Sequence, residues 1–408
     1  MALRKNQSQL TAAEKQQFTE AVIALKDGGR DGNIYDQFVS MHQNNILAGH
    51  FGPAFFAWHR KYLRKFEQAL QDIKQDPSLG LPYWDWTFDS NKASGIWSSN
   101  FMGGNGNSGQ DWQVQDGSFA YNTNKWPLKV RTTNEPNPYL RRQLGPDPGT
   151  SSSLPTLLDR VNALSATPYD AAPWNSASAS GFRSMAEGTI PTPGDHMHIR
   201  VHEWVGGSMT TFTSPNDPVF WLHHCFMDKL WADWQLMHPN EQWYVPSSGA
   251  PIPGHNLYDL MPPWDQQITP PFDRARPADV ISQWPLGYHY DSDGFLLAGE
   301  TLYPGQWIWS SSRGFYIRLD TDGILRLNRL SDNKTMWASE NSANTNVGSC
   351  TMQADGNLVT YDKSHYPIWA SNTASKDLGR YYLWVQDSGY VVIRRPTDNS
   401  ILWYRPTT

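Results

Sequence analysis

A threefold internal repeat near the C-terminus limits the possible folds of this chain more than any other feature of its sequence. Three similar segments recur about 33 residues apart: LDTDGILRLN at 319–328, MQADGNLVTY at 352–361 and VQDSGYVVIR at 385–394. Each is followed by a tryptophan, namely Trp337, Trp369 and Trp403. Alternating apolar and polar residues favour short strands. A fixed period with a recurring aromatic residue predicts three copies of one β unit, which bury their faces against each other.

The chain before residue 291 has helical rather than strand-like patterns. Apolar residues at helical spacing predict helices at 14–27, 53–73, 196–204 and 217–237. Asn216 or Asp217 can cap the last of these, with Pro218 in its first turn. Segments rich in Gly, Asn, Ser and Pro at 88–155 and 165–195 predict loops.

These patterns predict a multidomain protein with two parts of different class. Residues 1–291 are expected to form a mainly α-helical domain, a four-helix bundle with long loops that can hold a buried metal site. Residues 292–408 are expected to form an all-β domain, a three-faced β-prism.

Charge and composition exclude several classes of partner. The net charge is −6 and no block of Lys or Arg stands out, so we expect neither nucleic acid nor an anionic membrane as a partner. No apolar run reaches the length of a membrane span. The first residues, MALRKNQSQLTAAEKQQF, have no apolar core, so we expect a cytoplasmic protein, or one exported without a signal peptide of its own. Cys225 and Cys350 are expected to be free thiols.

Six of the twelve histidines have spacings that can build metal sites. His198 and His202 are four residues apart, which places both imidazoles on one helix face, and His224 follows on the next long helix. His50 and His59 lie on either side of the start of the helix predicted at Pro53, and His42 precedes them. Two groups of three histidines predict two adjacent metal ions.

The ligand type narrows the choice of metal. Sites made only of imidazole suit zinc, copper, nickel or iron, and the absence of Asp or Glu at a ligand spacing disfavours non-haem iron and di-iron carboxylate centres. The segment HIRVHE is not the H-E-x-x-H of zinc proteases. Neutral ligands among aromatic residues favour Cu(I), and a pair of Cu(I) ions can reduce dioxygen.

Two longer motifs connect the histidines to a known family. HFGPAFFAWHRKYLRKFE at 50–67 resembles the first copper signature of the tyrosinase family, and DPVFWLHHCFMD at 217–228 resembles the second. LPYWDW at 81–86 and HEWVGGSM at 202–209 are similar to bacterial tyrosinases. The resemblance implies two copper ions in a type 3 dinuclear centre, one held by His42, His50 and His59 and the other by His198, His202 and His224.

The resemblance also implies an activity. Such polyphenol oxidases use O2 to oxidise small o-diphenols to o-quinones, as catechol oxidases do, and true tyrosinases also hydroxylate monophenols as monooxygenases. Glu187 stands where the family has a glutamate that holds a water, and Ile199 replaces the asparagine that shares this water in bacterial tyrosinases. Glu203, directly after His202, is a candidate base or substrate guide. Consecutive helix positions diverge by about 100°, so His223 is expected behind the ligand His224.

The middle repeat has a resemblance of its own. QADGNLVTY at 353–361 is similar to the mannose motif Q-x-D-x-N-x-V-x-Y of bulb-type lectins. It implies that Gln353, Asp355, Asn357 and Tyr361 bind sugar hydroxyls while Val359 contacts the ring carbons. The other two copies are degenerate, so one site for a mannose-type glycan is expected at most. A second role for the domain is to cover the copper pocket.

Three other functions remain open at this level. The same centre can oxidise o-aminophenols, since an amine ortho to a hydroxyl loses two electrons by the same route. A haemocyanin-like protein would bind dioxygen without turning over a phenol. A lectin with a decayed oxidase is disfavoured by the complete set of six histidines.

Overall fold

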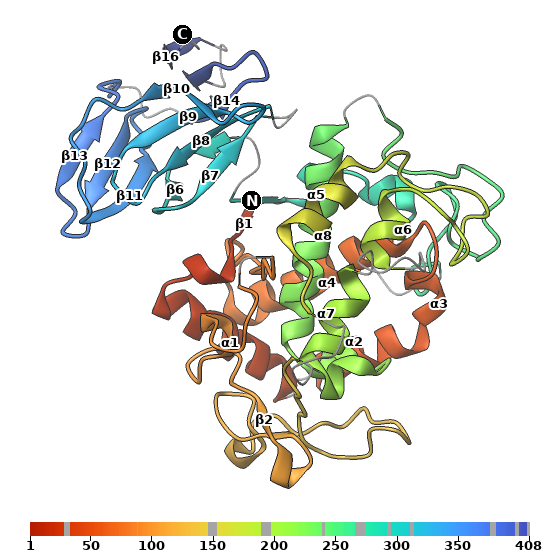
Figure 1. Cartoon of the computed structure of the whole chain (residues 1–408). Coiled ribbons are helices and arrows are strands. Elements are labelled where there is room, and N and C mark those ends of the chain that lie inside the picture. The colour runs from red at the N-terminus through yellow and green to blue at the C-terminus, as the bar shows by residue number, and fades with distance from the viewer. Residues whose placement is uncertain are drawn as a thin grey trace. The chain divides into compact units, whose positions relative to one another are not determined.

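The computed structural model divides the chain into two compact units (Figure 1), the first being Met1–Gln235 with Pro239–His289, and the second Leu236–His238 with Tyr290–Thr408. The structure describes residues 1–27, 33–87, 89–145, 153–188, 197–238, 241–265, 274–291, 295–310, 314–375, 381–395 and 400–405. The division after His289 lies close to the domain boundary expected from the sequence.

The first unit is mainly helical. Its α-helices are α1 (Ala12–Lys26), α2 (Ile34–Asn44), α3 (Ile46–Gly49), α4 (Phe55–Lys74), α5 (Leu157–Ser165), α6 (Phe182–Glu187), α7 (Met197–Val205) and α8 (Val219–Met237). The four helices expected from apolar spacing are present as α1, α4, α7 and α8. The stretch 165–195 was expected to be loop, and α6 corrects this, because a helix of six residues is too short to show a helical period. A regular four-helix bundle stays a prediction.

Side-chain caps fix where several of these helices begin. Thr11 and Glu14 form a capping box at α1, in which each side chain accepts from the backbone N–H of the other. The Asn33 side chain accepts from the Asp36 N–H at the start of α2. At α8 the cap is Asp217, whose Oδ1 accepts from the Val219 N–H at 3.0 Å.

A buried ion pair joins the two longest helices. Arg60 on α4 donates through Nε to Asp228 Oδ1 on α8 at 2.5 Å. Arg4 donates to the other oxygen of Asp228 and to Glu67 on α4. Because all four side chains are almost fully buried, this network fixes α4 and α8 against each other.

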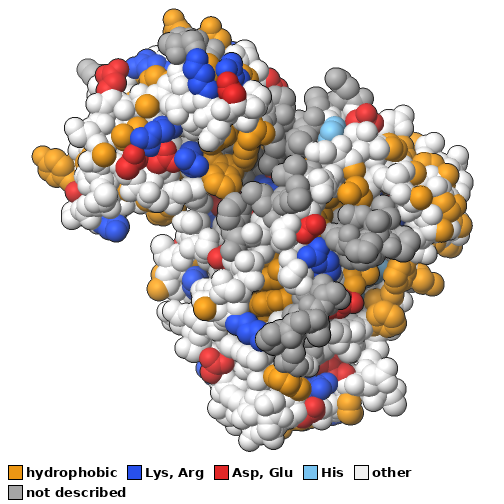
Figure 2. All heavy atoms as spheres, in the orientation of Figure 1, with side chains coloured by type: hydrophobic (Ala, Val, Ile, Leu, Met, Phe, Trp, Pro, Cys, Tyr) orange, Lys and Arg blue, Asp and Glu red, His pale blue; other side chains and the backbone are white. Residues whose placement is uncertain are grey.

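Short strands complete the first unit. The N-terminal strand β1 (Ala2–Arg4) pairs with β4 (Tyr288–Tyr290), and β2 (Gly106–Asn107) pairs with β3 (Gln113–Val114). None of the helices in the described ranges is long and apolar enough to span a membrane. Acidic and basic side chains are interspersed over the face drawn in Figure 2.

The second unit consists of three four-stranded antiparallel sheets, with strand orders β10-β9-β8-β7, β13-β12-β11-β6 and β16-β15-β14-β5. The strands are β5 (Phe295–Leu297), β6 (Thr301–Leu302), β7 (Trp307–Trp309), β8 (Phe315–Leu319), β9 (Leu325–Arg329), β10 (Lys334–Ala338), β11 (Val347–Met352), β12 (Leu358–Asp362), β13 (Pro367–Ala370), β14 (Tyr382–Val385), β15 (Val391–Arg394) and β16 (Ile401–Arg405). Each sheet takes three consecutive strands from one copy of the repeat and a fourth strand from residues 295–309.

The repeat tryptophans meet at the core of this unit, where Trp403 is buried and Trp337 and Trp369 are partly buried. Ring centroids of Trp337 and Trp403 are 5.5 Å apart, and Trp369 lies 5.8 and 6.3 Å from them. Apolar residues of all three sheets form one buried cluster around them. The three β units predicted from the repeat therefore bury their faces against each other.

Candidate metal centre

Three histidines of the first group converge from separate segments. His42 lies on α2, His50 directly follows α3, and His59 lies on α4. One ring nitrogen of each lies within 4.8 Å of those of the other two, and all three side chains are buried. Helix α2 was not among the predicted helices, so the element that positions His42 is a finding of the structure.

The second group lies on two neighbouring helices. His198 and His202 project from α7, and His223 and His224 from α8. The Nε2 atom of His224 lies 3.3 Å from the Nε2 atoms of both His198 and His202. Three ring nitrogens thus point at a common position.

The two groups adjoin each other. The His59 and His224 rings stack at a centroid distance of 4.2 Å, and those of His50 and His198 are 5.8 Å apart. Phe55 packs 4.8 Å from the His59 ring and 4.9 Å from that of His198, and therefore contacts both groups. The two groups could therefore hold two neighbouring metal ions.

Backbone carbonyls fix the tautomer of four of the rings. Their Nδ1 atoms lie 2.7 to 3.0 Å from carbonyl oxygens, in the pairs His42–Phe212, His50–Ile46, His59–Phe55 and His202–Met209. A carbonyl oxygen only accepts, so each Nδ1 carries the proton and each Nε2 presents a lone pair. Within the described residues, the buried Nε2 atoms of His42 and His59 have no hydrogen-bond partner.

Burial keeps the rings neutral. It lowers the pKa of His50 and of His202 to about 4, although a backbone carbonyl opposes the shift in each case. Burial also lowers the pKa of the other four well below its ordinary value, namely His42, His59, His198 and His224. Neutral imidazoles without a carboxylate or thiol in either group fit copper well.

His223 is held differently from its neighbour. Its Nδ1 accepts from the Trp86 indole N–H at 3.2 Å, and an indole nitrogen only donates. The proton of the neutral ring must then lie on Nε2, so neither nitrogen presents a free lone pair. Trp86, at the end of the LPYWDW segment, was not recognised from the sequence as a partner of this ring.

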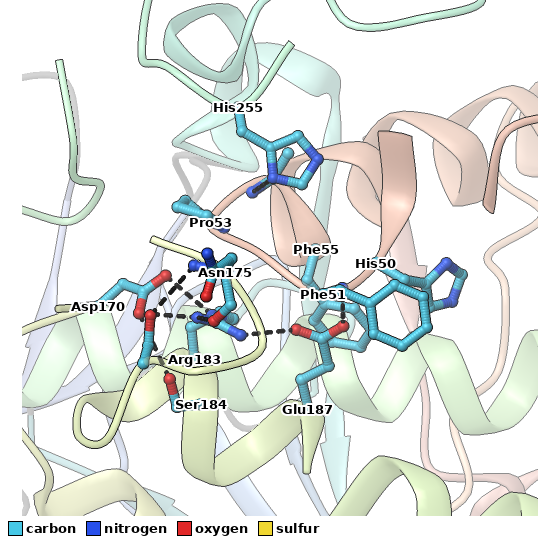
Figure 3. Close-up of polar contacts among 12 residues, drawn as sticks. His50, Phe51, Pro53, Phe55, Asp170, Asn175, Arg183, Ser184, Glu187 and His255 are labelled. Atoms are coloured by element: carbon cyan, nitrogen blue, oxygen red, sulfur yellow. Dashed lines mark hydrogen bonds and ion pairs between the residues drawn. The ribbon is translucent and has the colours of Figure 1, made fainter. Parts of the chain in front are cut away.

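Glu187 lies beside the His50 segment at the end of α6 (Figure 3). One carboxylate oxygen accepts from the Phe51 N–H, and the other accepts from Arg183 Nη1 at 3.0 Å. Arg183 in turn donates to both oxygens of Asp170 at 2.9 Å. Burial raises the pKa of the Glu187 carboxyl to about 7, against the opposing effect of Arg183. The carboxyl can therefore exchange a proton near neutral pH.

The other two residues expected at the active site lie on α7. Ile199 follows His198 and is half-buried, and Glu203 follows His202 and is exposed. Phe220, which the sequence analysis did not single out, packs its ring 4.1 Å from His224 and 5.1 Å from His42. Phe220 could have been found from its place four residues before His224 on α8, because residues at this spacing are neighbours on a helix surface.

The lectin-like motif lies on and before β12. Gln353 donates to the Tyr361 hydroxyl, and Asp355 accepts from the Asn357 N–H at 3.0 Å. Val359 is 3% exposed, which leaves a sugar ring little of it to touch. In the first copy, the carboxylates of Asp320 and Asp322 are both paired with Arg326. Among the residues that the structure describes, the expected sugar residues of the middle copy form no such ion pair.

Comparison with known proteins agrees with this site. Residues 32–237 match the common central domain of tyrosinase. The chain is 44% identical to the tyrosinase of Streptomyces glaucescens, over 72% of this chain and all of that one. The structure of a polyphenol oxidase from Thermothelomyces thermophila has the same fold over 71% of this chain and 88% of its own, with a TM-score of 0.54 and 22% identity. The mannose-specific lectin of snowdrop (Galanthus nivalis) bulbs is similar over 25% of this chain and 88% of its own, with a TM-score of 0.22 and 37% identity.

The chain matches the tyrosinase domain and is 44% identical to a tyrosinase, and two groups of histidines adjoin in its helical core, so it is a type 3 copper oxidoreductase. The motif at 50–67 contributes His50 and His59 to the first group, and the motif at 217–228 contributes His224 to the second. The chain belongs to the tyrosinase family, whose members share a dicopper oxidase function.

Proposed function

We propose that the first unit oxidises o-diphenols to o-quinones with O2, through one copper ion held by His42, His50 and His59 and another held by His198, His202 and His224. The observation that carries this proposal is the convergence of neutral imidazole nitrogens in two adjoining groups, with the buried Nε2 atoms of His42 and His59 unpartnered within the described residues. In the overall reaction two o-diphenols lose four electrons and four protons, and one O2 becomes two waters.

The protein's own part is to hold the ligands and to exclude water. The backbone carbonyls of Met209 and Phe212 each receive a ring N–H, one from each group, so this segment aligns both sites. Phe55 and Phe220 supply an apolar surrounding in which neutral ligands stabilise a low-charge ion. Bound as a pair, the copper ions would supply the binding and reduction of dioxygen.

His224 is the proposed ligand of α8 because the tautomer of His223 excludes that ring. The His224 Nε2 lies within 3.3 Å of two other Nε2 atoms, whereas both nitrogens of His223 are committed, Nδ1 to the Trp86 N–H and Nε2 to its own proton. Replacing His224 with glutamine should reduce bound copper from two to one per chain. Replacing His223 with glutamine should leave two, and equal loss in both variants would contradict the assignment.

Glu187 and Ile199 together determine how well a monophenol is used. A phenol must lose its proton before hydroxylation, and its ordinary pKa near 10 makes a base useful. Glu187, with a pKa of about 7, can take such a proton through a water, but Ile199 offers that water no hydrogen bond. We therefore propose efficient oxidation of diphenols and weak hydroxylation of monophenols.

Glu203 is proposed to act only at the entrance to the site. Its side chain is exposed, and the position after His202 diverges by about 100° from the direction of that ligand. It can attract a positively charged substrate amine there, and its direction away from His202 gives it no part in deprotonating a phenol.

The decisive experiment follows quinone formation from catechol together with oxygen consumption in the copper-loaded chain. Two quinones per O2 are expected, and His59→Ala should abolish the reaction. Reversible oxygen binding without quinone would favour the haemocyanin-like alternative. A parallel measurement with o-aminophenol decides whether that compound is the better substrate.

For the second unit we propose one site for a mannose-type glycan, formed by Gln353, Asp355, Asn357, Val359 and Tyr361. It is supported by the absence, at these positions, of the arginine pairs that occupy Asp320 and Asp322 in the first copy. Methyl-α-mannoside titrated into the whole chain should bind, and Asp355→Asn should weaken binding. Asp322→Asn is the matched control, and binding unaffected by Asp355→Asn would contradict the site.

A further inference from the structure

His255 is a buried histidine that takes no part in either metal group. It lies in the segment after α8 and is fully buried, and Figure 3 shows it on the opposite side of the His50 segment from Glu187. Its backbone oxygen accepts from the Tyr244 hydroxyl at 2.8 Å, which anchors the residue. The ring therefore has a fixed place from which it can act on its neighbours.

Both ring nitrogens of His255 contact the backbone of one short segment. Nε2 lies 3.0 Å from the Leu47 oxygen and 3.1 Å from the Ala48 oxygen, so it carries the proton and donates. Nδ1 accepts from the Ala54 N–H at 3.4 Å. The imidazole thus links the residues before His50 to those after it. Its Nε2–H donates to the earlier residues, and its Nδ1 accepts from the later one.

The segment is shaped to admit this ring. A Cβ at Gly52 would lie 2.5 Å from the His255 Nδ1, so no larger residue fits there without movement. Phe51 has a φ of 64°, a backbone conformation that side chains rarely adopt and that must be stabilised from outside. Its N–H donates to Glu187, which supports the same turn from the other side.

His50 stands between these contacts. Its ring donates to the Ile46 oxygen, at the start of the segment that His255 holds. The direction of its Nε2 therefore depends on the path of residues 46–54, which is set by His255 from one side and Glu187 from the other. A loosened segment would displace one ligand of the first copper and none of the second.

From this geometry we infer that His255 is a positioning residue for His50, which sets the copper affinity of the site formed by His42, His50 and His59. The inference rests on the proposed function. Partners that orient metal ligands typically change metal affinity by 10- to 100-fold when they are removed. Replacing a histidine with only a structural role in the core would instead lower stability and would not weaken one copper site more than the other.

The test measures copper binding by competition with a chelator in the whole chain. Wild type should bind two copper ions in two resolvable phases, which His59→Ala and His224→Gln assign to the two sites. His255→Phe should weaken the phase that His59→Ala removes by at least roughly 10-fold and leave the other unchanged. His255→Gln keeps an N–H for the Leu47 and Ala48 oxygens and should recover part of the loss.

Leu70→Ala is the control for lost stability. It removes a buried side chain from the far end of α4 and should lower the unfolding temperature without selecting one copper phase. Unchanged affinities in His255→Phe, or equal weakening of both phases, would overturn the inference while the proposed function stands. A wild-type chain that binds no copper would overturn the proposed function and this inference with it.

Discussion

At the scale of single residues, the protonation of each ring nitrogen determines whether it can offer a lone pair to a metal ion. Phe212 O and Met209 O place the protons of His42 and His202 on Nδ1 and so free Nε2. The Trp86 N–H has the opposite effect on His223. These histidines thus have different roles because of one neighbouring atom each.

Ile199→Asn should improve the use of monophenols. An asparagine beside His198 can hydrogen-bond a water that Glu187 also holds, so a phenol proton has a better acceptor. The initial rate on a monophenol relative to its o-diphenol should rise by roughly 100-fold, the low end for general acid–base catalysis. Ile199→Val is the control, and an unchanged ratio in Ile199→Asn would show that the water is not limiting.

His255 should make stability depend on pH. Burial lowers its pKa from 6.5 to about 4, so between these values the unfolded chain binds a proton that the folded chain does not. The stability from this group is therefore present above pH 6.5 and is lost as pH falls toward 4, by roughly 3 kcal/mol in total. In His255→Gln, urea unfolding of the copper-free chain should show a correspondingly smaller fall in stability over this range. An identical fall would exclude His255 as the titrating group.

At the scale of secondary-structure elements, the start of α8 depends on a buried charge. Arg142 donates twice to Asp217, through Nε and Nη2 at 2.7 Å each, and both side chains are fully buried. Asp217 also caps the helix through the Val219 N–H. The helix that carries His224 is therefore fixed at its beginning by a residue distant in sequence.

Asp217→Asn should destabilise the first unit by about 3 kcal/mol. The amide can still accept from the Val219 N–H, but it leaves the Arg142 charge buried without a counter-charge. Asp111→Asn is the matched control, since the Asp111–Arg141 pair is partly exposed and its loss should cost less than about 1 kcal/mol. Urea unfolding of the copper-free chain measures both, and equal losses would refute the role of burial.

Helices and strands could be predicted where the sequence has a long periodic pattern. The apolar period of α4 and α8 and the 33-residue repeat were sufficient for the main helices and the three β units. Helix α2 was missed although Asn33 and Asp36 give a start signal. Helix α6, with six residues, is too short to show a helical period.

Residues of the site could be predicted only where they belong to a recognisable sequence motif. The six histidines were predicted from their spacing and from the two copper motifs, whereas the Arg183–Glu187 pair was not predicted, because residues 165–195 were expected to be loop. The donors to Glu187 and His223 are a backbone N–H at Phe51 and an indole at Trp86, far away along the chain. Such contacts depend on tertiary packing, which no local pattern encodes.

At the scale of the whole molecule, the two histidine groups and the lectin-like motif belong to different units. Every histidine of the two metal groups lies in the first unit, and the apolar core of the second is built from residues between 296 and 403 alone. Each unit has its own core, as separate domains do. The chain should therefore unfold in two steps rather than one.

Copper should stabilise one of these steps only. A ligand that binds the folded state raises stability by RT ln(1 + [L]/Kd), or about 4 kcal/mol at a thousandfold excess over Kd, and it acts on the unit that binds it. Calorimetry of the copper-free and copper-loaded chain should show one transition moving to higher temperature and one unmoved. Leu327→Ala, in the core of the second unit, should lower the copper-insensitive transition and leave the other unchanged. A single transition that shifts as a whole would mean that the two units unfold together, and the threefold repeat would then depend on the copper domain for its stability.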